Sequence, residues 1–321
     1  MMLVPFALET DAISVAQDAN ASLLAQHHAF LQKWLALGVM VRPGEDADGL
    51  LHAVQSMPQR FRVRWQKMLK HARITCGPDG WQGLCHVNGA SDLQALKDHA
   101  DLALVDEVTA LVGLGIPEEE PGKMITDAGL EACKFDCFAL SETFEKAESL
   151  ASAGIRQGER IIDVWNQRFR SLARSARHVT IVDRYALSDG VGAAGLERFL
   201  KELDGAGRET MLAIYAALEK PGDEDAASNT LVQLRAKLSR GGIREIQLYL
   251  IPDKEFCWVH DRYLRFDRSV CELGEGVSVL GSRNNKVFRD CTFNFKPSMP
   301  EHHNRETWLK QVCTKDCPYL I

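Results

Sequence analysis

Several polar side chains of catalytic type interrupt an apolar stretch near residue 260: His260, Arg262, Tyr263 and Asp267. In an extended strand, side chains alternate between two faces, so His260 and Arg262 would share one face and form a local cationic site. An arginine offers a planar fork suited to phosphate oxygens, and a histidine can act as nucleophile or proton shuttle near neutral pH. An arginine and a histidine on one face therefore indicate a reaction at a phosphate ester. The alternative is a half-exposed strand whose polar side chains are simply hydrogen-bonded.

A short polar turn follows about fifteen residues later, with Gly281, Ser282, Arg283 and Asn284 in succession. Glycine permits a tight turn, and the small polar side chains are suited to holding an anion. The alternative interpretation is an ordinary hairpin turn.

The order of these residues resembles the H-x-K-x-x-x-x-D signature of the phospholipase D superfamily, with Arg262 in the Lys position. In many members G-S-x-N follows, and Gly281, Ser282 and Asn284 supply it here after a longer spacer than usual. The exchange of Lys for Arg keeps the charge but changes the geometry.

The string HDRYLRFD followed by LGEG resembles, more narrowly, the phospholipase D-like domain at the end of MIT-domain proteins and related bacterial domains. In that group a D-x-Y element recurs at the end of an earlier strand, and Asp183 and Tyr185 in IVDRY match it. The resemblance covers about residues 176–296.

The resemblance implies cleavage of a phosphodiester without metal or cofactor. His260 would be the nucleophile or the acid, and a second histidine would protonate the leaving oxygen. Arg262 would hold the phosphate together with Ser282 and Asn284, and Asp267 would support the site.

One such motif occurs in the chain, and single-motif members build the site across a homodimer, so we expect two copies of His260 to face each other. Nucleic acid is the expected substrate, and the habit of related bacterial chains points to a defence or toxin effector, including antiviral defence. A non-catalytic domain that binds a phosphate-bearing ligand or a protein partner is the alternative.

The elements that would position these residues alternate between helices and strands. Strands are predicted at 178–185, 209–217, 245–251, 256–266, 270–280 and 286–295, with helices at 195–203 and 229–239. The fold class expected is α/β, with a mixed sheet flanked by helices. A long amphipathic helix over 154–175 leads into this domain.

The first half is predicted to be a mainly helical α+β domain over 1–153, ahead of the domain at 154–321. Ala21–Leu37 has apolar residues at helical spacing with Gly38 as a stop, and Leu102–Val105 is compatible with a buried strand. Residues 1–150 carry 12 basic and 21 acidic side chains, whereas 151–321 carry 26 and 23. The basic half is therefore the better candidate to meet phosphate, and the acidic half is a candidate regulator or protein-docking module.

The sequence argues against a membrane-spanning protein and against a secreted one. No apolar run approaches the ~20 residues of a membrane helix, and the start of the chain lacks the basic residues of a secretory signal. Nine scattered cysteines, an odd number, predict reduced core thiols and a cytoplasmic protein.

Two weaker metal hypotheses remain. The acids Asp11, Asp106, Glu107 and Asp136 could bind Mg²⁺ or Mn²⁺ if the fold brought them together, although nothing in their spacing does. The C-x3-C pairs are Cys133 with Cys137 and Cys313 with Cys317; the second, with His302 and His303, has the donor types of a zinc site. Solvated acids and core thiols are the ordinary alternative.

Overall fold

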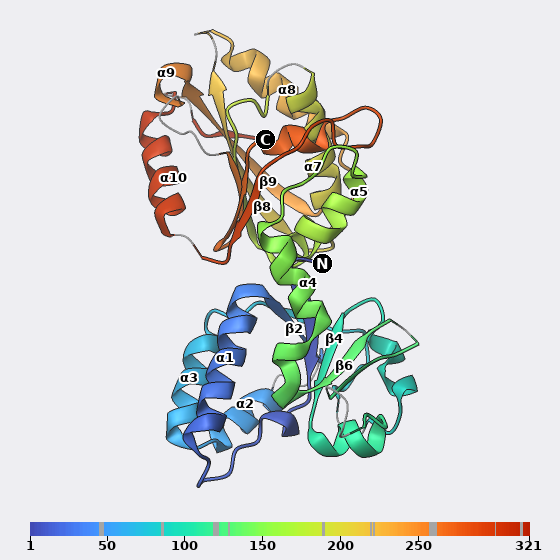
Figure 1. Cartoon of the computed structure of the whole chain (residues 1–321). Helices are drawn as coiled ribbons and strands as arrows, with labels where there is room; N and C mark the ends of the chain where they lie inside the picture. The colour runs from blue at the N-terminus through green and yellow to red at the C-terminus, as the bar shows by residue number, and fades with distance from the viewer. Residues whose placement is uncertain are drawn as a thin grey trace. The chain divides into compact units, whose positions relative to one another are not determined.

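The computed structural model describes residues 1–44, 48–84, 87–117, 122–127, 129–187, 190–218, 220, 222–256, 262–298, 300–314 and 317–321. The chain divides into two compact units, Met1–Ser149 and Leu150–Ile321. Both are α/β in class, as was predicted for the second (Figure 1).

The first unit is organised by a six-stranded sheet in the order β3-β2-β1-β4-β6-β5, within the described residues. Neighbours in the series β3-β2-β1-β4-β6 are parallel, and β5 is antiparallel to β6. The strands are β1 Val4–Leu8, β2 Gly38–Arg42, β3 Ile74–Cys76, β4 Leu102–Val105, β5 Lys123–Ile125 and β6 Glu131–Lys134. The helices are α1 Ala21–Leu37, α2 Asp48–Ser56, α3 Gln59–Leu69 and α4 Glu142–Ser152, with shorter turns η1 Asp11–Ile13, η2 Ala90–Leu96, η3 Thr109–Gly113 and η4 Phe135–Leu140.

This sheet corrects the prediction of a mainly helical α+β first half. More residues of this unit lie in helices than in strands, as predicted. The strands nevertheless form a largely parallel α/β sheet, which the sequence pattern did not reveal. Helix α1 ends at Leu37 and β2 begins at the next residue, so Gly38 is the first residue of a strand as well as a helix stop. A Cβ at Gly38 would lie 2.8 Å from the ring of Phe6, which is why glycine is needed at this junction.

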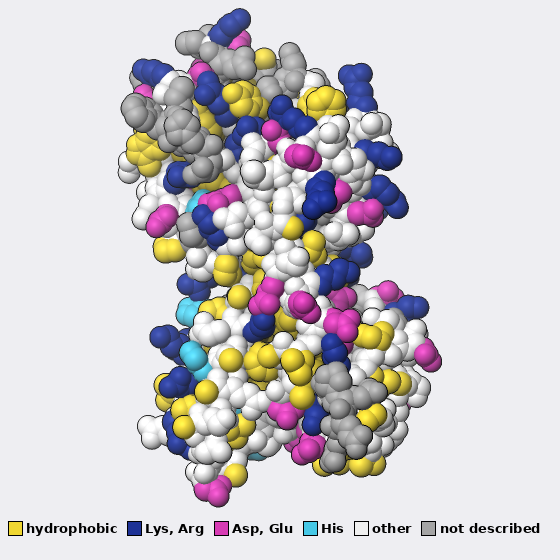
Figure 2. All heavy atoms as spheres, in the orientation of Figure 1, with side chains coloured by type: hydrophobic (Ala, Val, Ile, Leu, Met, Phe, Trp, Pro, Cys, Tyr) yellow, Lys and Arg dark blue, Asp and Glu magenta, His cyan; other side chains and the backbone are white. Residues whose placement is uncertain are grey.

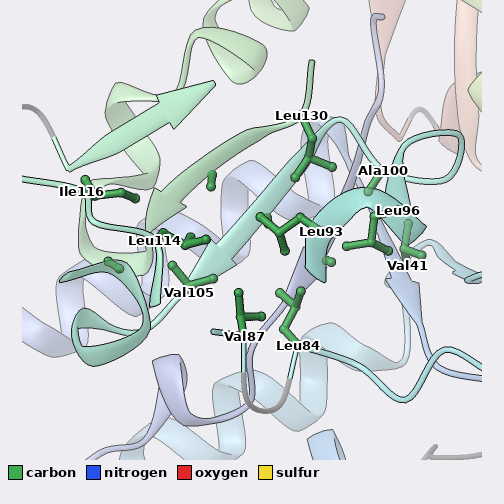
Figure 3. Packing of buried hydrophobic residues seen from close by; sticks show 14 residues of the cluster. Val41, Leu84, Val87, Leu93, Leu96, Ala100, Val105, Leu114, Ile116 and Leu130 are labelled. Atoms are coloured by element: carbon green, nitrogen blue, oxygen red, sulfur yellow. The ribbon is translucent and has the colours of Figure 1, made fainter. Parts of the chain in front are cut away.

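The core of the first unit includes an apolar cluster on one side of the sheet. Figure 3 shows side chains of this cluster from β2, η2, β4 and the loops around them pointing toward one another, among them Val41, Leu93, Leu96 and Val105. Burying side chains of this size contributes roughly 1.5–3 kcal/mol each, so the four-residue strand β4, buried throughout, is held mainly by packing.

The second unit is organised by a mixed sheet in the order β12-β11-β10-β7-β8-β9-β13, within the described residues. Strands β7, β8 and β9 are parallel, and β10, β11, β12 and β13 each run antiparallel to their neighbours. The strands are β7 His178–Val182, β8 Thr210–Leu218, β9 Ile243–Pro252, β10 Tyr263–Phe266, β11 Ser269–Leu273, β12 Phe293–Lys296 and β13 Tyr319–Leu320. The helices are α5 Ile161–Val164, α6 Arg170–Ser175, α7 Val191–Asp204, α8 Glu224–Ala236, α9 Asp253–Phe256 and α10 Pro300–Val312, with η5 Trp165–Phe169 and η6 Gly276–Leu280.

Helices cover both faces of this sheet (Figure 1). On one face, α10 inserts Leu309 into a cluster with Tyr215 and Tyr249, whose rings stack at 4.6 Å. On the other, Phe199 of α7 contacts Trp165 and Phe266 at 5.6 and 6.2 Å between ring centroids. The central strand β7 is therefore buried between two helical layers.

Part of the strand prediction near the motif is wrong. The strand predicted at 256–266 is β10, which begins at Tyr263, and Phe256 instead ends helix α9. The stretch 270–280 is strand only to Leu273, and then forms the helical turn η6. In the second stretch, Gly274 and Gly276 interrupt the extended backbone. In the part of the chain that the structure describes, no helix is long and apolar enough to cross a membrane.

Candidate functional site

The carboxyl end of strand β7 carries a buried acid. Residues Val179 to Val182 are buried, and β7 pairs with β8 on one side and β10 on the other. Asp183 follows directly and is 1% exposed. A carboxylate in such a place must be satisfied by hydrogen bonds, because burial without partners costs several kcal/mol.

Two backbone groups supply those hydrogen bonds. The N–H of Tyr185 donates to Oδ1 of Asp183 at 3.0 Å, and the N–H of Val277 donates to Oδ2 at 2.8 Å. Gly276 has a φ of 58°, and a Cβ there would lie 1.9 Å from Oδ2 of Asp183. Gly276 is the last residue of the LGEG string. Glycine is needed there because η6 approaches the carboxylate of Asp183 too closely for a side chain.

Arg262 lies beside this carboxylate. Burial raises the pKa of Asp183, and the two backbone hydrogen bonds and the positive charge of Arg262 oppose that rise. The Arg262 guanidinium also lies 5.3 Å from the centroid of the Tyr185 ring, which is 43% exposed. The structure therefore brings together Arg262 of the H-x-R-x4-D motif and both residues of the D-x-Y element.

A second arginine completes the group. The guanidinium of Arg184 lies 5.6 Å from the Tyr185 ring centroid and pairs with Asp253 at 2.6 Å. Sequence reasoning missed Arg184 because it occupies the variable position of D-x-Y. Two guanidinium groups around one exposed phenol ring form a local surface to which phosphate oxygens are attracted. We call Asp183, Arg184, Tyr185 and Arg262 the arginine cluster.

Asp267 lies at the other end of the same strands. Tyr263 is paired with Val182 and Phe266 with Val179, so the hairpin after β10 falls next to the start of β7. There Asp267 has a φ of 49°, and its carboxylate accepts the backbone N–H of His178 at 3.0 Å and that of Arg177 at 3.2 Å. It thus fixes the beginning of β7, and the structure does not bring it to the arginine cluster.

Ser282 and Asn284 close a turn. The hydroxyl of Ser282 donates to Oδ1 of Asn284 at 2.6 Å, and the N–H of Lys286 donates to the same oxygen at 3.2 Å. A Cβ at Gly281 would lie 2.0 Å from the carbonyl oxygen of Val191, so the turn packs directly on the start of α7.

Two of the residues predicted to hold the phosphate, Arg262 and Asn284, line different hollows. Arg262 lines one of 270 Å³ with Gly274 and Thr292, and Asn284 lines another of 490 Å³. Among the described residues, no hydrogen bond or ring contact joins Arg262 to Ser282 or Asn284. His260, two positions before Arg262 in the sequence, lies outside the described residues.

The structure brings some first-half acids together. Glu9, absent from the predicted set, is buried at the end of β1 and accepts the N–H of Asp106 and the hydroxyl of Thr109, both at 2.8 Å. Burial raises the pKa of Glu9, and the charges of Asp106 and Asp11 add to that rise. Glu9 directly follows an apolar segment in the sequence, and this was the signal that could have identified it. The carboxyl ends of neighbouring parallel strands meet at one edge of a sheet, so an acid after one strand lies near residues that follow the next.

Neither metal hypothesis gains a ligand set. Within the described ranges, no three His, Cys, Asp or Glu side chains are placed to hold a metal ion, and this covers Asp11, Asp106, Glu107 and Asp136. His302 is buried against the ring of Tyr263 at 4.5 Å, and the Cys317 thiol contacts the hydroxyl of Thr314. Burial raises the pKa of Cys133 to about 12 and that of Cys313 to about 11, so both are neutral thiols at pH 7.

Comparison with models of known families and with curated proteins finds no match to this chain.

Proposed function

We propose that the second unit is a phosphodiesterase of the phospholipase D-like type that cleaves nucleic acid without a metal. The observation that carries the proposal is the contact between Arg262 and Tyr185 beside the buried Asp183. These residues come from the two sequence elements on which the resemblance depends, some 80 positions apart in the chain.

The proposed reaction has two steps. A ring nitrogen of His260 attacks phosphorus, the bond from phosphorus to the leaving oxygen breaks, and a second histidine gives that oxygen its proton. Water then attacks the phosphorus of the phosphohistidine and gives a proton to the second histidine, the phosphorus–nitrogen bond breaks, and the phosphate ester and free His260 are released. With one motif per chain, the second histidine is His260 of another copy, so the active species is a homodimer.

Arg262 has a charge-stabilising role in this scheme. A guanidinium that already lies against a ring and near a carboxylate loses less entropy when it binds phosphate oxygens, and it stabilises negative charge that builds on them in the transition state. The carboxylate of Asp183 accepts hydrogen bonds from two backbone N–H groups, so we assign it a structural role beside Arg262 and not the role of a base.

The test is cleavage of labelled single- and double-stranded DNA and RNA in EDTA. The intact chain should cleave at least one of them, and His260→Ala should abolish cleavage. His303→Ala, which removes an exposed histidine of α10, should not. Arg262→Met should lower kcat, and Arg262→Lys should retain most of it because the charge is kept. A chain that cleaves nothing in EDTA, or that is strictly monomeric while active, contradicts the proposal.

A second candidate function is binding of a phosphate-bearing ligand or a protein partner without cleavage. The observation that favours it is that Arg262 and Asn284, both predicted to hold one phosphate, line different hollows. Tight binding of nucleic acid by a chain that cleaves none would support this function over the first.

A further inference from the structure

The hollow of 490 Å³ that Asn284 lines has an apolar floor. Ile161, Ile162, Trp165 and Leu280 line it; Ile162 is 40% exposed, and the other three are almost fully buried. Its volume is within the range of about 300–1,000 Å³ found for sites that hold small organic ligands. A flat, weakly polar group would therefore bury its faces here.

The rim of the hollow is basic. Arg160, Arg198 and Lys286 line it, against one carboxylate, Glu202. Figure 2 shows Lys and Arg side chains over the part of the second unit that carries α5 and α7, with acidic side chains among them. The net positive rim favours an anionic group over the apolar floor.

The cations of the rim differ in how they are held. Arg198 donates from Nη2 to Oδ1 of Asn285 at 2.7 Å, and Asn285 itself is in the left-handed region with a φ of 59°. Arg160 is 3.6 Å from Asp163 in an exposed and hence weak pair. Within the part of the chain that the structure describes, the ammonium of Lys286 has no hydrogen bond or ion pair.

The backbone beneath the rim is fixed. The N–H of Ile161 donates to the carbonyl of Asn285 at 3.0 Å, and the N–H of Val287 donates to the carbonyl of Glu159 at 2.8 Å. Arg160 and Lys286 are paired in an isolated antiparallel β-bridge between these two segments. The hollow is therefore preformed, which reduces the entropic cost of binding.

We infer that this hollow binds a nucleoside phosphate, with the phosphate on Arg198 and Lys286 and the base on the apolar floor, where Ile162 offers the exposed surface. The amide of Asn284, whose oxygen already accepts two hydrogen bonds, offers its N–H groups to the same ligand. The ligand is a free nucleotide or one nucleotide of a strand, which share this chemistry. Binding here requires neither His260 nor Arg262, so it does not depend on the proposed cleavage.

The test is a binding titration of the full chain in EDTA, in a His260→Ala background that keeps the ligand intact. Adenosine 5′-monophosphate and a short labelled oligodeoxythymidine are the two probes, and inorganic phosphate is the third. The double variant Arg198→Glu, Lys286→Glu should bind about tenfold or more weakly, because it removes two charge-assisted contacts. Lys97→Glu, an exposed change in the first unit, should bind as the parent does.

The probes separate the sources of the ligand. Binding of the mononucleotide that the double variant loses supports a free nucleotide, and the same loss with the oligonucleotide alone supports a strand. Inorganic phosphate bound as tightly as the mononucleotide would overturn the role of the apolar floor. The inference also fails if neither nucleotide probe binds, or if the double variant binds as well as Lys97→Glu. Cleavage by the His260-containing chain is scored separately, so loss of one function is distinguishable from loss of the other.

Discussion

His27 makes the stability of the first unit depend on pH in a way that can be measured. Its side chain lies in helix α1, is 2% exposed, and has the rings of Phe61 and Phe135 at 5.1 and 5.2 Å from its own. The indole N–H of Trp65 donates to its Nδ1 at 3.1 Å. Burial lowers the pKa of His27 from 6.5 to about 4.

The sign and size of the effect follow from this difference. Below pH 6.5 the unfolded chain takes up a proton at this histidine, whereas the folded chain resists it until about pH 4. The free energy of unfolding therefore falls as the pH is lowered through this window. At 1.36 kcal/mol per pKa unit the loss is about 2 kcal/mol at pH 5 and about 3 kcal/mol at pH 4.

The assay compares urea denaturation of the wild type and His27→Gln at pH 7.5 and pH 5. Glutamine keeps an oxygen acceptor for Trp65 and does not titrate, so the wild type should lose about 2 kcal/mol more than the variant between the two pH values. Other titrating groups, Glu9 among them, are common to both chains and cancel. His52→Gln, on the exposed side of α2, is the control and should behave as wild type. Equal losses in wild type and His27→Gln would refute the reasoning.

Three substitutions in the second unit test its packing, each by urea denaturation of the full chain. Gly195→Ala should lower the free energy of unfolding by about 2 kcal/mol, because its Cβ would lie 2.1 Å from the carbonyl oxygen of Val277; an unchanged or more stable variant would show that α7 can move away. Glu306→Ala should cost about 3–5 kcal/mol, since it leaves the largely buried guanidinium of Arg265 without its bidentate partner; a smaller loss than for Gly195→Ala would mean that water reaches the arginine. Asp267→Ala should cost about 1 kcal/mol by removing the acceptor of two backbone N–H groups at the start of β7; a neutral result would leave Asp267 free for another role.

The sequence predicted the second unit better than the first for a physical reason. Strands β7, β8 and β9 are five to ten residues long and rich in β-branched and aromatic residues, so their pattern is visible locally. In the first unit, β3, β4, β5 and β6 have three or four residues each, and β2 follows a helix with no loop. Of these, β4 was predicted, because its four residues are all apolar; the others are stabilised by neighbours far away in the chain, which no local pattern contains.

The candidate site was likewise predicted in part from the sequence. Residue types and order singled out Asp183, Tyr185 and Arg262, and these three side chains lie together, whereas Asp267, Ser282 and Asn284 lie elsewhere. Arg160 and Lys286, by contrast, are brought to one hollow by an isolated β-bridge between segments more than a hundred positions apart. Only the fold shows that pairing.

The spacer between Asp267 and Gly281 bears on how a residue pattern for this unit should be written. It consists of strand β11 and the turn η6, and η6 is positioned by close contact with α7 at Gly195 and Gly281. The position of Gly281 relative to the start of α7 is therefore fixed by these two contacts as well as by the length of the spacer. A pattern with a fixed gap from Asp267 to Gly281 would record the length alone, whereas one that also requires a small residue in α7 would record the contact.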